Sequence, residues 1–227
     1  MDIISNIFQI ITGTMSVIIA LSVFLFSKKK HKQDAFYPLF PTILNRVKES
    51  IDNIQLSTTR LNGNKTSILI TDNCNYSIFA DSSVYKNFCQ YYVEYSRVVN
   101  NKPYNGAKVA NVWENYVSNL HNRAMFDSVF KNIYICIYNI DNAEISVSEK
   151  EKCVRLVADV LNSEQLFCYM INIVHNCKGY CSDDETTKML LKYNFFRDLF
   201  NSEVYAKIEN TIDVSIIRCF SLPQIKN

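Results

Sequence analysis

The 227-residue chain has very little glycine and proline, with only four of each. This scarcity argues against all-β folds with many Gly/Pro turns and against collagen-like or linker-rich chains. The four glycines, Gly13, Gly63, Gly106 and Gly179, lie far apart, so the sequence holds no P-loop and no dinucleotide-binding fingerprint. The zinc-protease motif HExxH is also absent from the sequence. Several common classes of enzyme are thereby excluded.

Neither sign of charge is in clear excess, since 24 Lys and Arg stand against 22 Asp and Glu. The first 32 residues contain Lys28, Lys29, Lys30 and Lys32 but only one acidic residue, Asp2, which leaves 20 basic and 21 acidic residues in the rest of the chain. The hydrophobic fraction of 48% is ordinary for a globular protein and excludes wholesale disorder. We therefore expect a folded domain without direct sequence-specific nucleic-acid binding.

Residues 3–26 form an uncharged run, IISNIFQIITGTMSVIIALSVFLF, and the basic cluster from Lys28 to Lys32 follows it. A helix of this length spans about 36 Å, enough to cross a hydrocarbon core of about 30 Å. A cleaved signal peptide fits this segment less well, because it carries its positive charge before the apolar run. A buried core helix also fits less well, because a helix of this length in a core usually has a charged face. The positive-inside rule places the lysines in the cytoplasm and the short amino terminus outside. The sequence predicts a transmembrane anchor with a basic flank over residues 1–32 and a cytosolic helical domain over residues 33–227.

Thr12, Ser16 and Ala20 recur every four residues along this run. Small side chains at that spacing allow two membrane helices to approach closely, which favours self-association into a homo-oligomer. The alternative is a single helix that lies alone in the lipid.

The rest of the chain has helical periodicity, so the expected fold class is mainly α. Helices are predicted over residues 36–59, 84–99 and 108–140, then from Ser148 to the stop at Gly179, and again after Ser182. Ser148-x-x-Glu151 and Ser182-x-x-Glu185 are the expected capping boxes, whereas residues 162–165 either cap a new helix or bend the preceding one. A change to alternating periodicity predicts a small β-hairpin with strands over residues 67–71 and 76–80.

The chain has eight cysteines, and the predicted compartment is reducing. Cys136, Cys153 and Cys168 fall at apolar helical positions and are expected in the core. His175, Cys177 and Cys181 form the one cluster with metal-like spacing in the sequence. A second ligand pair is missing at any recognisable interval, so a zinc site is the weaker interpretation, and no cofactor is expected.

Other candidate site residues have a simpler structural explanation. His121 beside Arg123 fits an exposed helix surface, and the acidic residues 183–185 fit a helix amino terminus. Trp113 and Tyr116 could line a pocket, but a helical aromatic pair is more often part of a core. We therefore expect no catalytic site.

Short segments between residues 126 and 200 carry a family resemblance. They are Phe130-Lys-Asn-Ile-Tyr134, Ile137-Tyr-Asn-Ile-Asp141, Leu161-Asn-Ser-Glu-Gln-Leu166 and Leu191-Lys-Tyr-Asn-Phe-Phe-Arg-Asp-Leu199. In this order they resemble the phage abortive infection (AbiC-like) proteins, with a looser match over residues 34–56. The residues that carry the resemblance are Phe130, Asn132, Tyr134, Asp141, Leu161, Gln165, Leu166, Tyr193 and Phe196. The chain departs from the family at residues 158–162, has Gln165 where the family has Glu, and has Cys153 where Tyr is common.

The resemblance implies a cytosolic helical domain behind amino-terminal membrane helices and a role in antiphage defence by killing or arresting the infected cell. Related architectures are similar to the membrane effectors of retron systems, in which a reverse transcriptase and its DNA product silence a toxic partner. We expect a bacterial inner-membrane effector that contacts membrane lipid and acts by disrupting the membrane as an oligomer. The alternatives are a membrane-tethered adaptor that recruits another defence protein, and an unrecognised cytosolic hydrolase or nuclease toxin.

Overall fold

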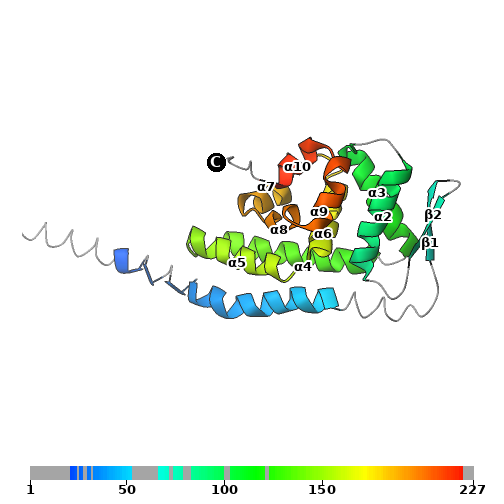
Figure 1. Ribbon diagram of the computed structural model, residues 1–227. Helices are drawn as coiled ribbons and strands as arrows, with labels where there is room; N and C mark the ends of the chain where they lie inside the picture. Colours follow the sequence, from blue (N-terminus) through cyan, green and yellow to red (C-terminus); the bar gives the residue numbers. More distant parts are fainter. Residues whose placement is uncertain are drawn as a thin grey trace, which may run out of the picture.

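The computed structural model describes residues 21–24, 26–27, 30–31, 33–52, 66–71, 74–78, 83–99, 103–120 and 123–221. Residues 33–52 form an amino-terminal helix, and a short β-hairpin and a group of helices follow it (Figure 1). The helices are α2 (Val84–Val98), α3 (Gly106–Leu120), α4 (Arg123–Asn142), α5 (Val147–Asp159), α6 (Ser163–Asn176), α7 (Glu185–Lys192), α8 (Arg197–Phe200), α9 (Glu203–Ile208) and α10 (Val214–Phe220), with a 3₁₀ turn at Glu209–Thr211.

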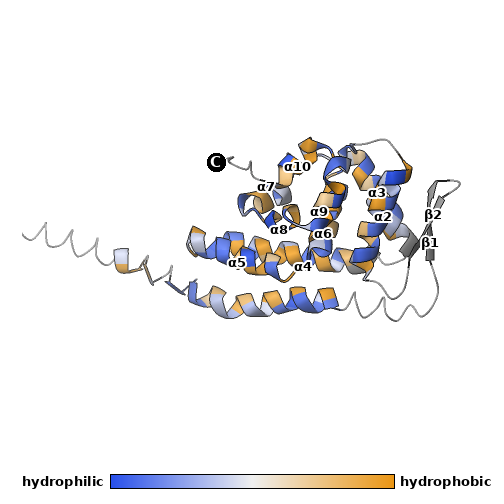
Figure 2. Cartoon of the chain, viewed as in Figure 1, coloured by the Kyte–Doolittle hydropathy of each residue, from blue (hydrophilic) through white to orange (hydrophobic). Residues whose placement is uncertain are grey.

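The predicted transmembrane helix is wrong as far as the described residues test it. None of the helices found in the described ranges is both long enough and apolar enough to cross a membrane. Only residues 21–24 and 26 of the predicted span are described, too short a stretch to cross a membrane. The longer helices of the described part are amphipathic, with hydrophobic and hydrophilic residues alternating along them (Figure 2). Residues 3–20 and Leu25 of the predicted span lie outside the described residues, and so do Thr12, Ser16 and Ala20. Among the flanking lysines, Lys30 is exposed, whereas Lys28, Lys29 and Lys32 are also outside the described part.

The hairpin consists of β1 (Thr66–Thr71) and β2 (Cys74–Ile78), which pair antiparallel with Thr66 opposite Ile78. The second strand begins two residues earlier than the sequence predicts. The register is irregular between Leu69 and Thr71, where Thr71 pairs with Cys74 across a shorter connection than expected. The hairpin packs against α2 and α3, which gives a two-stranded sheet the support it needs.

Three helix starts show how local hydrogen bonds define the elements. The capping box of α5 uses Ser146 and Glu149, not Ser148 and Glu151, because Glu149 is the residue that can reach back to the Ser146 N–H, at 2.9 Å. The Asn162–Gln165 box opens α6 as a new helix. Asp184, not Ser182, caps α7, and its carboxylate accepts the Thr187 N–H at 2.8 Å.

Two predicted continuous helices are interrupted. The region over residues 108–140 divides into α3 and α4, and the helix after Ser182 ends at Lys192. Asn194 has a φ of 48°, a left-handed conformation that stops the helix before α8 begins.

The core is rich in aromatic side chains from helices distant in sequence. A chain of ring contacts with centroid distances of 4.8–6.0 Å runs from α2 to α10 and consists of Phe88, Trp113, Phe126, Phe130, Tyr169, Phe196 and Phe220. Trp113 and Tyr116 are buried, and the three cysteines expected in the core are buried there. The amino-terminal helix adds Phe36, Phe40, Val47 and Ile51 to this core. Tyr37 beside them donates a hydrogen bond to the Glu149 carboxylate of α5.

The turn between α6 and α7 lies directly against the start of α3. Lys178 and Gly179 have φ values of 51° and 84°, and the Gly179 N–H donates to the Val174 carbonyl at 2.9 Å, as expected of a helix stop. A Cβ added to Gly106 would come within 2.5 Å of the Gly179 Cα. The absence of both side chains therefore lets two backbones touch, and this contact fixes the position of the turn.

Candidate functional site

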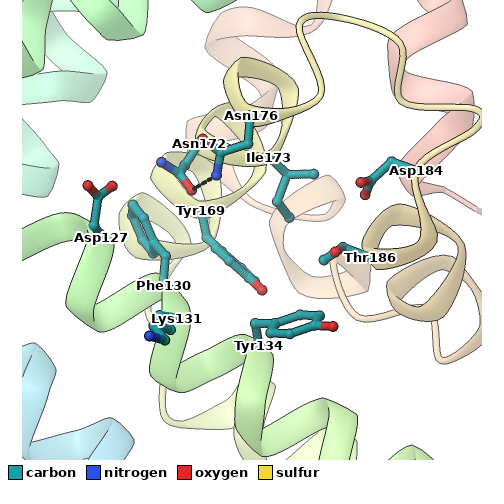
Figure 3. Close-up of a pocket in the computed structure, with 10 residues that line it drawn as sticks. All are labelled: Asp127, Phe130, Lys131, Tyr134, Tyr169, Asn172, Ile173, Asn176, Asp184 and Thr186. Carbon is teal, nitrogen blue, oxygen red and sulfur yellow. Dashed lines mark hydrogen bonds between the residues drawn. The ribbon is translucent and has the colours of Figure 1, made fainter.

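A pocket of about 420 Å³ lies between α4, α6 and the start of α7 (Figure 3). Its volume is within the range of sites that take small organic molecules, about 300–1,000 Å³. The lining residues are Asp127, Phe130, Lys131 and Tyr134 from α4, Tyr169, Asn172, Ile173 and Asn176 from α6, and Asp184 and Thr186 from the start of α7. Aromatic and aliphatic side chains form one part of the lining, and polar groups form the other.

Tyr169 occupies the middle of this pocket. Its ring stacks on Phe130 with a centroid distance of 5.3 Å and lies 6.0 Å from Phe196. The side chain is only 2% exposed, yet its hydroxyl has no hydrogen-bond partner among the described residues. In Figure 3 the hydroxyl points toward the space between Tyr134 and Thr186. Burial, with smaller contributions from Asp184 and Tyr134, raises the pKa of Tyr169 well above its ordinary value, so the group keeps its proton.

The polar part of the lining comes from all three helices, with Asp127 and Lys131 on α4. Asn172 and Asn176 lie one turn apart on α6, and the Asn176 amide donates to the Asn172 side-chain carbonyl at 3.1 Å. Asn172 is 5% exposed, which makes it one of the few buried polar side chains among the described residues. Asp184 faces these amides from the start of α7, where it also accepts from the Thr187 hydroxyl at 3.0 Å. The pocket thus offers a hydroxyl, an amide and a carboxylate beside aromatic rings.

The residues that carry the family resemblance divide between this pocket and its surroundings. Phe130 and Tyr134 line the pocket, and Phe196, which is not part of the lining, contacts the Tyr169 ring. Leu161 and Leu166 are buried in the core, and Gln165 forms the α6 capping box with Asn162. Asn132 is half-buried on α4.

Asp141 and Tyr193 are brought into contact although 52 residues separate them. The Asp141 carboxylate accepts hydrogen bonds from the Tyr193 hydroxyl and, at 2.6 Å, from Lys192. Burial tends to raise the pKa of Asp141, but the hydrogen bonds and positive charge of Lys192, the Tyr193 hydroxyl and the charge of Lys150 outweigh it, and the pKa is lowered. The contact joins the end of α4 to the end of α7.

The His175, Cys177 and Cys181 cluster does not converge on one point. The His175 ring contacts the Glu114 carboxylate of α3 at 2.8 Å, whereas the sulfur atoms of Cys177 and Cys181 lie 3.0 Å from each other. Within the part of the chain that the structure describes, no group of three His, Cys, Asp or Glu residues could hold a metal ion.

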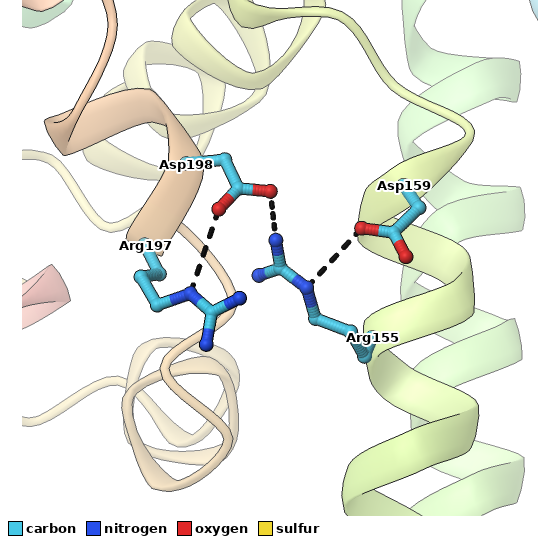
Figure 4. A network of polar contacts seen from close by, with 4 residues as sticks. All are labelled: Arg155, Asp159, Arg197 and Asp198. Carbon is cyan, nitrogen blue, oxygen red and sulfur yellow. Dashed lines mark hydrogen bonds and ion pairs between the residues drawn. The ribbon is translucent and has the colours of Figure 1, made fainter.

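A second hollow of about 660 Å³ lies between α5 and the segment from α7 to α8. Basic residues prominent in its lining are Lys152, Arg155, Lys192 and Arg197. Figure 4 shows that Arg155 contacts Asp198 and, at 3.1 Å, Asp159, while Arg197 lies 3.5 Å from Asp198. Lys192 is paired with Asp141. Because three of these four cations already have acidic partners, the hollow is a weaker candidate for anion binding than its lysines and arginines suggest.

Sequence reasoning missed most of the pocket. It named Phe130, Tyr134 and the acidic residues 183–185 but did not single out Tyr169, Asn172, Asp127 or Thr186. The available signal was the polar sequence Tyr169, Asn172, Asn176 at spacings of three and four, which sets the Asn172 amide on the buried face of an otherwise apolar helix and the Asn176 amide at its exposed end. His121, the other histidine considered, lies outside the described residues.

Comparisons with known proteins give no match. No family model fits the chain, and neither a curated protein nor a solved structure is significantly similar to it. Support for a function therefore comes from the pocket and from the resemblance of residues 126–200.

Proposed function

We propose that this chain is an antiphage defence effector of the abortive infection type, controlled by a small ligand that binds in the pocket between α4, α6 and α7. The observation that carries the ligand site is the Tyr169 hydroxyl, which is buried and has no hydrogen-bond partner among the described residues. Leaving such a group unsatisfied costs about 1–3 kcal/mol. Other buried hydroxyls of the described residues, such as that of Tyr85, also lack a partner, and Tyr169 differs from Tyr85 in that it lines a pocket.

The chemistry of the lining limits what this ligand can be. A flat apolar part would lie against Phe130 and Tyr134, and a polar edge would hydrogen-bond to the Asn172 amide and, after a side-chain shift that uncovers it, to the Tyr169 hydroxyl. Asp184 lies close enough to influence the Tyr169 hydroxyl electrostatically and favours an N–H donor on that edge. The proposed ligand is therefore a small planar molecule with hydrogen-bonding groups along one side.

The lining favours binding over catalysis. It contains neither a histidine nor a cysteine, and its one aliphatic hydroxyl, Thr186, lies across the pocket from Lys131, the basic residue of the lining (Figure 3). Tyr169 holds its proton because its pKa is raised by burial, so it is a hydrogen-bond donor and a poor base. We propose that ligand binding changes the state of the chain and that no reaction occurs in the pocket.

The defence role is supported by the resemblance. Two residues that carry it, Phe130 and Phe196, contact the Tyr169 ring, so the resembling segments contribute to the proposed site. A reverse transcriptase with its DNA product is the proposed silencing partner, and the ligand would then act as the signal that ends silencing.

The experiment compares phage plating on bacteria that carry the wild-type gene with its neighbouring genes, a Tyr169→Phe variant, or an empty vector. Tyr169→Phe removes only the hydroxyl and preserves the ring contacts. We expect wild-type cells to restrict phage and the variant to plate phage at the empty-vector level, with equal protein abundance.

Tyr85→Phe is the matched control. Tyr85 is 1% exposed, and its hydroxyl also has no partner among the described residues, but it lies on α2 outside the pocket. The control should restrict phage as the wild type does. Unimpaired restriction by Tyr169→Phe, or equal loss in both variants, would contradict the proposal.

A further inference from the structure

Two thiols face each other in the turn that joins α6 to α7. The sulfur atoms of Cys177 and Cys181 are 3.0 Å apart, and no disulfide joins them. Cys177 is the residue that ends α6, and the left-handed conformations of Lys178 and Gly179 turn the chain back on itself. The turn is held against Gly106 by backbone contact, so the proximity of the thiols is built into the fold.

The two thiols differ in exposure and acidity. Cys177 is half-buried, whereas Cys181 is 2% exposed. The hydrogen bond with Cys181 lowers the pKa of the Cys177 thiol, and the same hydrogen bond and burial raise the pKa of the Cys181 thiol. Cys177 is therefore the thiol that an oxidant can reach and the one that more readily becomes a thiolate, which is the nucleophilic form.

A third thiol stands near this pair. Cys219 of α10 is half-buried, and burial together with the charge of Cys177 raises the pKa of its thiol. Its thiol donates to the Ser215 carbonyl at 3.2 Å, one turn back along α10. Cys181, whose sulfur lies 3.0 Å from the Cys177 sulfur, is the better placed partner for Cys177.

We propose that Cys177 and Cys181 form a redox-active pair that reacts with hydroperoxides and closes to a disulfide. The Cys177 thiolate attacks one peroxide oxygen, the O–O bond breaks, and hydroxide leaves and is protonated to water. The resulting Cys177 sulfenic acid is attacked by the Cys181 sulfur, which forms the S–S bond and releases a second water. In total, two thiols lose two hydrogen atoms and one hydrogen peroxide becomes two waters.

The position of the pair gives the modification a structural consequence. The Cys181 carbonyl accepts the Asp184 N–H, and Asp184 and Thr186 form one edge of the pocket. A disulfide in the turn would restrain the segment that carries this edge. This consequence rests on the proposed function, whereas the chemistry of the pair does not. Disulfides in reducing compartments are usually of this transient, redox-sensing kind.

The test treats the reduced full-length protein with hydrogen peroxide, quenches it with acid, alkylates free thiols and maps peptides without reduction. We expect a linked peptide that joins Cys177 to Cys181, restored to free thiols by dithiothreitol. Reduced Cys177 should also react with iodoacetamide about tenfold faster than Cys89, which is equally half-buried.

Single variants assign the roles. Cys181→Ser should trap a sulfenic acid on Cys177 that dimedone labels, Cys177→Ser should abolish the reaction, and Cys219→Ser should leave the linked peptide unchanged. Thiols that stay reduced at a peroxide excess, or a link from Cys177 to Cys219 in the wild type, would overturn the proposal. Because the readout is a covalent bond, the result is independent of phage restriction and of any pocket ligand.

Discussion

The two hollows of this domain differ in how their most buried polar group is paired. In the hollow beside α5, Arg155, Arg197 and Lys192 each have a carboxylate partner. In the pocket beside α4, the Tyr169 hydroxyl is more deeply buried than any of these groups and has no partner among the described residues. The first arrangement satisfies its own charges and holds helices together. The second leaves a hydroxyl unpaired in the lining of a pocket, at a cost in stability that a bound ligand would offset.

The comparison of the two hollows predicts the largest difference in stability when one apolar side chain of each is replaced by alanine. Phe130 is 4% exposed and stacks on Tyr169, so Phe130→Ala should lower the free energy of unfolding by about 3–5 kcal/mol. Leu156 lines the other hollow but is 50% exposed, so Leu156→Ala should change stability by only about 0.5 kcal/mol. Urea unfolding monitored by circular dichroism measures both values. If the two variants lost similar amounts of stability, Phe130 would not belong to the hydrophobic core that supports the pocket.

In the hollow beside α5, the ion pair between Asp141 and Lys192 should have a smaller effect on stability, and this effect should depend on pH. The pKa of Asp141 is lowered in the folded protein, so its contribution to stability is present above the ordinary carboxyl value of 3.8 and is lost as pH falls through the folded value. Asp141→Asn should therefore cost about 1 kcal/mol at neutral pH, and the difference from wild type should disappear in acid.

The control for this acid dependence is Tyr169→Phe, because Tyr169 stays protonated over the whole acidic range. Its stability relative to wild type should not vary between neutral and acidic pH. Unfolding curves at a series of pH values test both variants, and an Asp141→Asn difference that persists unchanged in acid would show that the carboxylate charge contributes nothing.

The sequence predicts the helical class, the extent of α2 and the core positions of Trp113 and Cys168, because periodicity and burial preference are local properties. It misplaces the cap of α5 by two residues because Ser146 and Ser148 both precede an acidic residue at the right spacing, and only the chain geometry selects Ser146. The transmembrane prediction rested on composition in a segment most of which lies outside the described residues, and the helices that are described are amphipathic.

The pocket could not be predicted because it depends on contacts between distant segments. Tyr169 and Phe130 are 39 residues apart, and nothing in either local pattern indicates that their rings stack. Whether a buried tyrosine hydroxyl finds a partner is decided by what the neighbouring helices place opposite it. The Cys177 and Cys181 pair was visible in the sequence as a metal-like spacing, but the turn that joins the two sulfur atoms and the contact that takes His175 to α3 were not.

The most direct test of the central claim is native mass spectrometry of the full-length protein purified from phage-infected cells, with the Tyr169→Phe variant purified in parallel. The proposal predicts a small-molecule adduct on the wild-type protein during infection that is lost or strongly reduced in the variant. Wild-type protein that carries no adduct, or an adduct retained equally by Tyr169→Phe, would contradict the claim that the pocket beside α4 is a ligand site.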